Sequence, residues 1–326
     1  MKKKLLCLGL VASALLSGCG KKKGIKINTD KEKYTIGICQ LVQHDALDAA
    51  TNGFKEQLKV ELEAKGRKVE FNYQNASGDA PLCTTIINGF VSQDVDLILA
   101  NATPALQAAY NATETIPILG TSITDYGCAL NLEMKDGKSG KNVSGTSDLA
   151  KISDQIEIML SLLSGRTINK VGILYCSAEA NSIFQKNEAE KALKAKGINV
   201  SVKSFSETAD LTAVCASLLD CDAVYLPTDN TVASNATIIK ANITDKNIPV
   251  FAGEAGICEK CGFATLSIDY TQLGRITGTM AAKILLGEKD IREYPVQYDE
   301  NPTKMYNKAI AEQLGITIPE DFVEIK

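Results

Sequence analysis

The segment that decides the fold is Asp96-Leu97-Ile98-Leu99-Ala100-Asn101-Ala102-Thr103, a short apolar run that ends in small polar residues. It recurs about 130 residues later as Asp222-Ala223-Val224-Tyr225-Leu226-Pro227-Thr228-Asp229. Two flanking segments recur in the same order: Ile36-Gly37-Ile38-Cys39 returns as Val171-Gly172-Ile173-Leu174-Tyr175-Cys176, and Ile116-Pro117-Ile118-Leu119-Gly120 returns as Ile248-Pro249-Val250-Phe251-Ala252-Gly253. Because order and spacing are kept, the sequence predicts two similar α/β lobes rather than one large sheet.

Stretches of helical periodicity separate the apolar runs, which is typical of a parallel sheet covered by helices. Apolar stripes predict helices within residues 47–65, 151–164 and 188–196. A further predicted helix at residues 270–286 has no counterpart in the first repeat. We expect this helix to cross back to the first lobe.

The N-terminus has the layout of an export signal. Three lysines (Lys2, Lys3 and Lys4) precede an apolar run that ends in Leu16-Ser17-Gly18-Cys19, and the run is too short for a mature membrane-spanning helix. Leu-Ser-Gly-Cys resembles the bacterial lipoprotein box, which implies cleavage after residue 18 and acylation of the Cys19 thiol by lipid chains such as palmitate. We therefore interpret residues 1–18 as a lipoprotein signal peptide and residues 19–33 as a solvated polar tether.

Composition and charge exclude several classes of function. Removal of Lys2, Lys3 and Lys4 with the signal changes the net charge from −4 to −7, which argues against a nucleic-acid partner. The sequence contains no GxSxG, HExxH or GxGxxG motif, and its single histidine, His44, forms neither a triad nor a metal cage. We therefore expect a binding protein rather than an enzyme, with no cofactor and no metal.

Eight of the ten cysteines remain after Cys7 and Cys19 are set aside. Most follow apolar strand or helix patterns and are expected to be small buried residues. Cys258-Glu259-Lys260-Cys261 is the only CxxC motif and lacks further zinc ligands nearby. A loop disulfide, two free thiols and a redox role all remain open for this pair.

The binding site is predicted at the carboxyl ends of the strands, where loops lead into helix N-termini. Hydroxyl, amide and acidic residues occupy these ends, with almost no Lys or Arg: Gln43, His44, Asp45, Thr103, Thr121, Ser122, Thr124 and Asp125 in the first lobe, and Ser177, Glu179, Asn181, Ser182, Thr228, Asp229, Asn230, Thr231 and Glu254 in the second. Such a set suits a small zwitterion, whose ammonium prefers carboxylates and whose carboxylate prefers hydroxyls and helix N–H groups.

Each of these residues also has a structural interpretation. Asp45 and the Thr103-Pro104 pair fit helix N-termini as caps, and Asp229-Asn230 fits a turn or a cap. Among the carboxylates, Asp229 is our first candidate for the ammonium partner and Glu254 the second. His44 is expected to orient a ligand or to bond the backbone of the cleft.

Six segments carry a family resemblance: Ile36 to Asp48, Asn75-Ala76-Ser77-Gly78-Asp79, Ala102-Thr103-Pro104, Glu179-Ala180-Asn181-Ser182, Thr228-Asp229-Asn230-Thr231 and Asp269-Tyr270-Thr271-Gln272-Leu273-Gly274. Together they resemble the ABC-transporter substrate-binding lipoproteins of the tryptophan and tyrosine type. The resemblance implies a type I periplasmic-binding fold with two Rossmann-like lobes, parallel sheets and three hinge crossovers. We place residues 34–146 and 270–293 in the first lobe and residues 147–269 and 294–326 in the second. Binding positions carry over onto His44, Asp45, Thr103, Ser122, Asn181, Ser182, Asp229, Asn230, Glu254 and Asp269.

The resemblance also implies the partners of the protein. These are an aromatic amino acid, an ABC permease with its ATPase, and the outer face of a Gram-positive cell membrane reached through the N-terminal lipid. Polar strand ends favour tyrosine, whose phenol needs a polar partner, over tryptophan or phenylalanine. A second interpretation is an exposed adhesin that contacts host or neighbouring cell surfaces, although no sequence feature marks such a patch.

Overall fold

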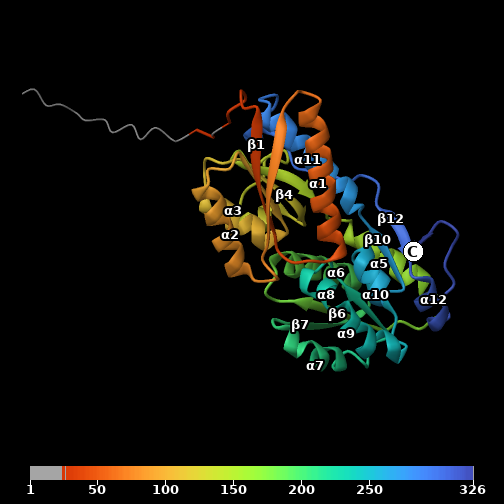
Figure 1. The fold of residues 1–326 in the computed structure, drawn as a ribbon. Helices are drawn as coiled ribbons and strands as arrows, with labels where there is room; N and C mark the ends of the chain where they lie inside the picture. Colours follow the sequence, from red (N-terminus) through yellow and green to blue (C-terminus); the bar gives the residue numbers. More distant parts are fainter. Residues whose placement is uncertain (1–23, 26, 326) are drawn as a thin grey trace, which may run out of the picture.

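The computed structural model describes residues 24, 25 and 27–325, so the predicted signal peptide and Cys19 lie outside the described residues. The chain forms two α/β lobes that lie one above the other in Figure 1. No helix in the described part of the chain combines the length and apolar character needed to cross a membrane.

Lobe 1 is built on a parallel six-stranded sheet in the order β11-β5-β4-β3-β1-β2. Its elements are β1 (Lys33–Gln40), α1 (Asp45–Glu63), β2 (Lys68–Asn75), α2 (Ala80–Ser92), β3 (Leu97–Asn101), α3 (Thr103–Ala112), β4 (Ile118–Ile123), α4 (Tyr126–Leu130), β5 (Val143–Ser147), α11 (Tyr270–Leu285), η3 (Ile291–Glu293) and β11 (Gln297–Tyr298).

Lobe 2 is built on a seven-stranded sheet in the order β13-β12-β10-β9-β8-β6-β7, in which β12 pairs antiparallel with β10, so that β12 and β13 run opposite to the other five strands. Its elements are α5 (Ile152–Leu162), β6 (Lys170–Cys176), α6 (Ala180–Ala195), β7 (Asn199–Phe205), η1 (Thr208–Asp210), α7 (Leu211–Ala216), β8 (Ala223–Leu226), α8 (Asn230–Ser234), α9 (Ala236–Asn242), η2 (Thr244–Lys246), β9 (Val250–Ala252), α10 (Ala255–Cys261), β10 (Ala264–Ser267), β12 (Thr303–Tyr306), α12 (Lys308–Leu314) and β13 (Val323–Glu324).

The internal repeat is confirmed by the strand order. The run β5-β4-β3-β1-β2 in lobe 1 matches the run β10-β9-β8-β6-β7 in lobe 2 position by position. The repeated apolar segments form the central strands of both sheets, and helices on both faces of each sheet bury them in separate cores. Two equivalent α/β units therefore present equivalent strand ends.

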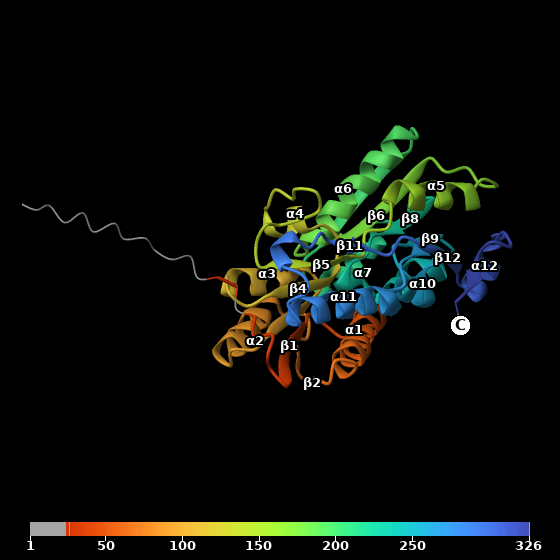
Figure 2. The same ribbon diagram turned by 90° about the horizontal axis from the view of Figure 1, so that it is seen from above.

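Helix α11 returns to lobe 1 and lies beside α1, as both views show (Figure 1, Figure 2). The two helices touch through glycines: a Cβ on Gly53 would lie 2.2 Å from the Thr271 carbonyl oxygen, and one on Gly274 would lie 2.1 Å from the Ala50 carbonyl oxygen. Only glycine permits this backbone approach. The crossing-back helix is thus confirmed.

The chain passes between the lobes at three places: after β5 at Asp148, after β10 at Asp269, and between β11 and β12. The last crossing differs from the boundary expected at residue 294, because β11 pairs with β5 and extends lobe 1 to Tyr298. Two-residue strands such as β11 carry too little pattern to be recognised in a sequence.

The segment before β1 also differs from the expected solvated tether. Ile25 and Ile27 are partly buried against the lobe 1 core, and the Arg67 guanidinium donates to the Lys31 carbonyl oxygen at 3.1 Å. Lys31 itself forms an ion pair with Asp96. The described part of the predicted tether therefore packs on lobe 1.

All eight cysteines in the described residues are free thiols, and Cys128 alone is exposed. Cys258 and Cys261 lie inside helix α10 rather than in a loop, and both are fully buried. Their thiols lie within hydrogen-bond reach of the carbonyl oxygens of Gly262 and Ile257, respectively. The described chain contains no group of His, Cys, Asp and Glu that could hold a metal ion.

Candidate functional site

The carboxyl ends of the two sheets face each other, as the sequence predicts. Side-chain contacts away from the hinge crossings join the lobes: His44 Nε2 lies 3.3 Å from Asn230 Oδ1, Gln185 Nε2 donates to Thr124 Oγ1 at 2.9 Å, and Lys260 Nζ lies 2.7 Å from Asp45 Oδ2. On the lobe 1 side each contact comes from a loop or helix start, whereas the lobe 2 partners are the first residue of α8 (Asn230) and residues within α6 (Gln185) and α10 (Lys260). The structure is therefore a closed arrangement of the two lobes.

A cluster of buried polar residues lies between the lobes. Its members are less than a tenth exposed and come from six different strand ends: His44, Thr103, Ser122, Asn181, Ser182, Asp229 and Glu254. The buried carboxylates of the described chain are Asp148, Glu179, Asp229 and Glu254, whereas none of its Lys or Arg side chains is buried. Buried polar groups cost free energy unless they are partnered, so this cluster indicates a site rather than a core.

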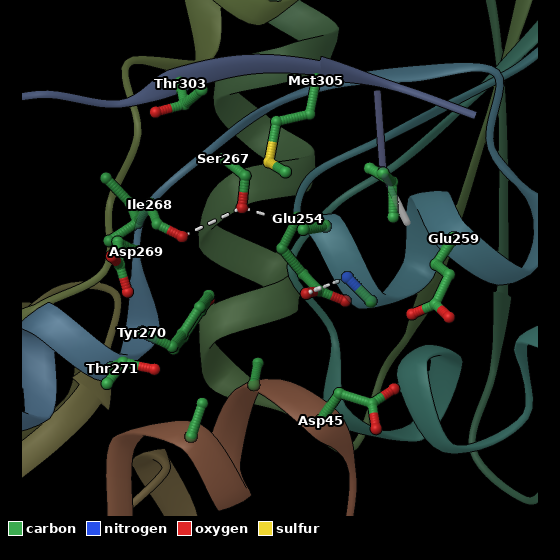
Figure 3. Close-up of a pocket in the computed structure, with 15 residues that line it drawn as sticks. Asp45, Glu254, Glu259, Ser267, Ile268, Asp269, Tyr270, Thr271, Thr303 and Met305 are labelled. Carbon is green, nitrogen blue, oxygen red and sulfur yellow. Dashed lines mark hydrogen bonds between the residues drawn. The ribbon is translucent and has the colours of Figure 1, made fainter. Parts of the chain in front are cut away.

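Three of the predicted site residues line a cavity beside the cluster, and one of them, Glu254, also belongs to the cluster. Asp45, Glu254 and Asp269 border this cavity of about 340 Å³, which lies against the hinge crossing at Asp269 (Figure 3). Asp45 is exposed and paired with Lys260, and Asp269 Oδ1 accepts from the Gln272 backbone N–H at 3.0 Å as the cap of α11. Asp45 and Asp269 therefore lie at the margin of the site.

Asn230 faces a second cavity of about 310 Å³, whose lining also includes Pro104 and Glu179. This lining draws on the β1, β2 and β3 ends of lobe 1 and on the β6, β7 and β8 ends of lobe 2. The buried cluster is thus flanked by two cavities between the lobes.

The lobe 1 wall has strained backbone at two strand ends. Ala102 has φ 85° and Ser122 has φ 57°, conformations that L-residues rarely adopt and that are common at functional sites. Ser122 Oγ is buried and has no hydrogen-bond partner among the described residues. A hydroxyl left in this state can bond a ligand.

The N-cap position of α3 is not occupied by Thr103, as the sequence had predicted, but by Ala102. Ala102 is the N-cap, Thr103 is the first helical residue and Pro104 the second. Because alanine has no side-chain acceptor, the first N–H groups of this helix are not capped by the N-cap side chain. Similarly, His44 rather than Asp45 is the N-cap residue of α1.

The lobe 2 wall centres on Glu179, which the sequence placed at a strand end but did not select as a site residue. Its Oε1 accepts from Thr231 N (2.9 Å) and Thr231 Oγ1 (2.7 Å). Its Oε2 accepts from Asn230 N (3.1 Å), Asn230 Nδ2 (2.6 Å) and Asn181 Nδ2 (3.1 Å). One buried carboxylate therefore holds two of the predicted site residues, Asn181 and Asn230.

Asp229 and Glu254 both act as helix N-caps. Asp229 accepts from the backbone N–H groups of Val232 at 2.8 Å and Cys176 at 2.6 Å. Glu254 accepts from those of Ile257 at 2.6 Å and Gly256 at 2.7 Å. Burial, and secondarily the charge of Glu179, raises the pKa of Asp229 to about 8.

Asp148 was missed by the sequence analysis and lies at the first hinge crossing. It accepts from Tyr270 OH at 3.0 Å and from Thr124 Oγ1 at 3.3 Å, and Tyr270 begins the helix after the second crossing. Burial raises the pKa of Asp148 to about 6, although both hydroxyl bonds oppose the shift. The signal available in the sequence was a lone acid between a strand and a helix, which has no distinctive pattern.

This fold and cleft define a two-lobed substrate-binding protein. Residues 35–325 match the family described as ABC transporter substrate binding protein, and the chain belongs to that family. Its members bind substrates for transporters and are not enzymes.

Three relatives illustrate the similarity. A tyrosine-binding protein of Clostridioides difficile is 34% identical over 302 residues, covering 90% of this chain and 86% of its own. The structure of an ABC domain from Streptococcus pneumonia in complex with L-Trp is 31% identical, with a TM-score of 0.82 over 88% of this chain and 96% of that one. The ligand-free, open structure of a substrate-binding protein with adhesive properties from Clostridium difficile is 36% identical, with a TM-score of 0.68 over 90% of this chain and 99% of that one.

Proposed function

We propose that this protein is the lipid-anchored receptor of an ABC importer and binds an aromatic amino acid between its lobes. Tyrosine is the favoured ligand, followed by tryptophan and phenylalanine. The relatives support this choice, since one is described as tyrosine-binding and another has L-Trp bound. The receptor delivers its ligand to a permease with its ATPase.

The observation that carries the proposal is a pair of unsatisfied atoms in the buried cluster. Ser122 Oγ of lobe 1 and Asn181 Oδ1 of lobe 2 are both buried without a hydrogen-bond partner in the described chain. Leaving such atoms unpaired is costly, and a zwitterion between the lobes satisfies both. The α-carboxylate binds at Ser122 and the N-terminus of α3, and the ammonium binds at the lobe 2 wall.

Ligand binding in this scheme closes the lobes about their crossings, with residues 34–146 and 270–298 moving against 147–269 and 299–325. The similarity scores support this scheme. The relative with L-Trp bound matches the closed arrangement better than the ligand-free, open relative does, although the open one has the higher sequence identity. Small-angle scattering tests closure: the radius of gyration of ligand-free protein decreases on saturation with ligand, and an unchanged radius contradicts it.

The proposed anchor is the acylated Cys19 thiol, which holds the protein on the outer face of a Gram-positive cell membrane. The support is the Leu16-Ser17-Gly18-Cys19 sequence together with the extracytoplasmic role of importer receptors.

Adhesion is a second candidate function, favoured by the relative that is described as having adhesive properties. The test is binding of the purified protein to host epithelial cells, with an unrelated lipoprotein as the control. Binding above the level of the control supports an adhesive function, and binding equal to the control contradicts it.

Calorimetry tests the central proposal. The full-length protein, freed of ligand by unfolding and refolding, is titrated with tyrosine, tryptophan, phenylalanine and a non-aromatic amino acid. Saturable binding of at least one aromatic amino acid, tighter than that of the non-aromatic control, supports the proposal. Absence of binding by all three aromatic ligands contradicts it.

A further inference from the structure

The carboxylate of Glu179 has no capacity left for a ligand. It accepts five hydrogen bonds, from the backbone and side chains of Asn230 and Thr231 and from the Asn181 amide. A carboxylate offers about four lone-pair sites, so these donors occupy it fully. Glu179 is also 4% exposed. Its effect on a ligand must therefore pass through the residues that it holds.

The first of these residues is Asn181. Its Nδ2 faces three acceptors: Glu179 Oε2 at 3.1 Å, Ser182 Oγ at 3.3 Å and the Thr228 carbonyl oxygen at 3.3 Å. The opposite amide orientation would place Oδ1 against a carboxylate and a carbonyl oxygen, which repel it. Asn181 Oδ1 is thereby fixed on the other side, buried and without a partner in the described chain.

The second residue is Asn230. Its Nδ2 donates to Glu179 Oε2 at 2.6 Å, and its Oδ1 points to lobe 1, where it lies 3.3 Å from His44 Nε2. Both amides thus turn their hydrogens to Glu179 and their oxygens away from it. The result is a wall of acceptors in lobe 2.

We propose that Glu179 is the positioning residue of an ammonium subsite, in which it fixes the Asn181 and Asn230 amides so that their oxygens accept from a primary ammonium group. This inference rests on the proposed function and specifies its chemistry. The subsite selects ligands that carry an α-ammonium and rejects the same molecule without it, because the unpartnered oxygen then stays unsatisfied. The negative charge of Glu179, which no buried Lys or Arg of the described chain balances, favours the cation further.

This assignment replaces a direct ion pair with Asp229 or Glu254. Both of those carboxylates bond backbone N–H groups at the start of their own helices. Neither orients a side chain that is left unpartnered. Glu179 orients two amides, and one of them, Asn181, has an acceptor oxygen without a partner in the described chain.

The test compares two ligands on the purified full-length protein: L-tyrosine and 3-(4-hydroxyphenyl)propanoate, which lacks only the ammonium. The variants are Glu179→Gln, which places an amide N–H against the donors, and Asn181→Ala, which removes the free oxygen. Glu188→Gln is the control, because Glu188 is an exposed acid on the same helix. Melting curves of all variants establish that they fold.

Wild type and Glu188→Gln are expected to prefer tyrosine about 30-fold or more. In Glu179→Gln and Asn181→Ala this preference falls to within about threefold, since affinity for tyrosine drops and affinity for the propanoate changes little. A general loss of stability would weaken both ligands alike and leave the ratio unchanged. If Glu179→Gln does not fold, the ligand preference of Asn181→Ala alone tests the inference.

Two results overturn the inference. If the variants bind tyrosine and keep the wild-type preference, Glu179 does not position the subsite, while the proposed function stands. If wild type binds no aromatic amino acid, the proposed function fails together with the inference.

Discussion

His44 Nε2 of lobe 1 lies 3.3 Å from Asn230 Oδ1 of lobe 2. Because Asn230 uses its Nδ2 to bond Glu179, its oxygen can only accept, and the imidazole must donate from Nε2. His44 is the N-cap residue of α1, directly after the end of β1. The single histidine of the chain is thus part of one of the contacts that join the two lobes.

His44→Ala is expected to weaken ligand binding about 5- to 10-fold, equivalent to one interlobe hydrogen bond of about 1 kcal/mol that forms on closure. The melting temperature of the ligand-free protein should change little. Lys260→Ala is the matched control, because it removes an interlobe ion pair in which Asp45 is 61% exposed and which contributes little. Calorimetry that finds equal losses for both variants would contradict a special role for His44.

Asp229→Asn is expected to change how stability depends on pH. Burial raises the folded-state pKa of Asp229 to about 8, compared with about 3.9 in an unfolded chain. The folded state therefore holds the proton more strongly, and this stabilisation is full below about pH 4 and disappears as the pH rises to about 8.

The asparagine variant lacks this titration but places an amide N–H against the Cys176 N–H. It should therefore be less stable than wild type at pH 5 by about 1–3 kcal/mol, and the gap should narrow toward pH 8. Urea unfolding at both pH values measures the gap, with Asp79→Asn as an exposed-cap control. A gap that stays constant or widens would refute the assignment of a buried, protonated Asp229.

Tyr270→Phe removes a hydroxyl that bonds Asp148 at 3.0 Å across two hinge crossings. The buried carboxylate then keeps only the Thr124 hydroxyl among its side-chain partners in the described chain, and the free energy of unfolding should fall by about 1–3 kcal/mol. Tyr298→Phe, at a residue that is 55% exposed, should stay within about 0.5 kcal/mol of wild type. Equal unfolding midpoints for the two variants would show that this hydrogen bond does not stabilise the fold.

Cys19→Ala should release the protein into the culture medium, because the thiol is the only acyl acceptor at the predicted cleavage point. Fractionation of cells and medium by immunoblot measures this. The Cys7→Ala variant serves as the control, since that residue lies within the predicted signal peptide. Retention of Cys19→Ala on the membrane would show that the anchor lies elsewhere.

Much of the fold was predictable because it is encoded in local patterns. The repeated segments around Asp96 and Asp222 specified equivalent strands in both sheets, and the unmatched helix after Asp269 indicated a crossing. The packed segment at Ile25 and Ile27 was missed, because two isolated apolar residues form no period. The two-residue strand β11 was missed for the same reason.

The position of the site could be predicted from the sequence, but the hydrogen bonds among its residues could not. Strand ends placed His44, Ser122, Asn181 and Asp229 in one buried cluster. Which atoms remain unpaired depends on how separate loops meet, and no single segment of sequence contains that information. The bonding of Glu179 depends on donors from its own segment, at Asn181, and from a distant one, at residues 230–231.

The most direct test of the central claim is native mass spectrometry of the ligand-free protein mixed with all twenty amino acids at equal concentration. A single bound molecule with the mass of an aromatic amino acid, tyrosine first, is the predicted result. Ser122→Ala should reduce the bound fraction, since it removes the unpaired hydroxyl of lobe 1. Exclusive binding of a non-aromatic amino acid, or of none, would contradict the assignment of this protein as an aromatic amino-acid receptor.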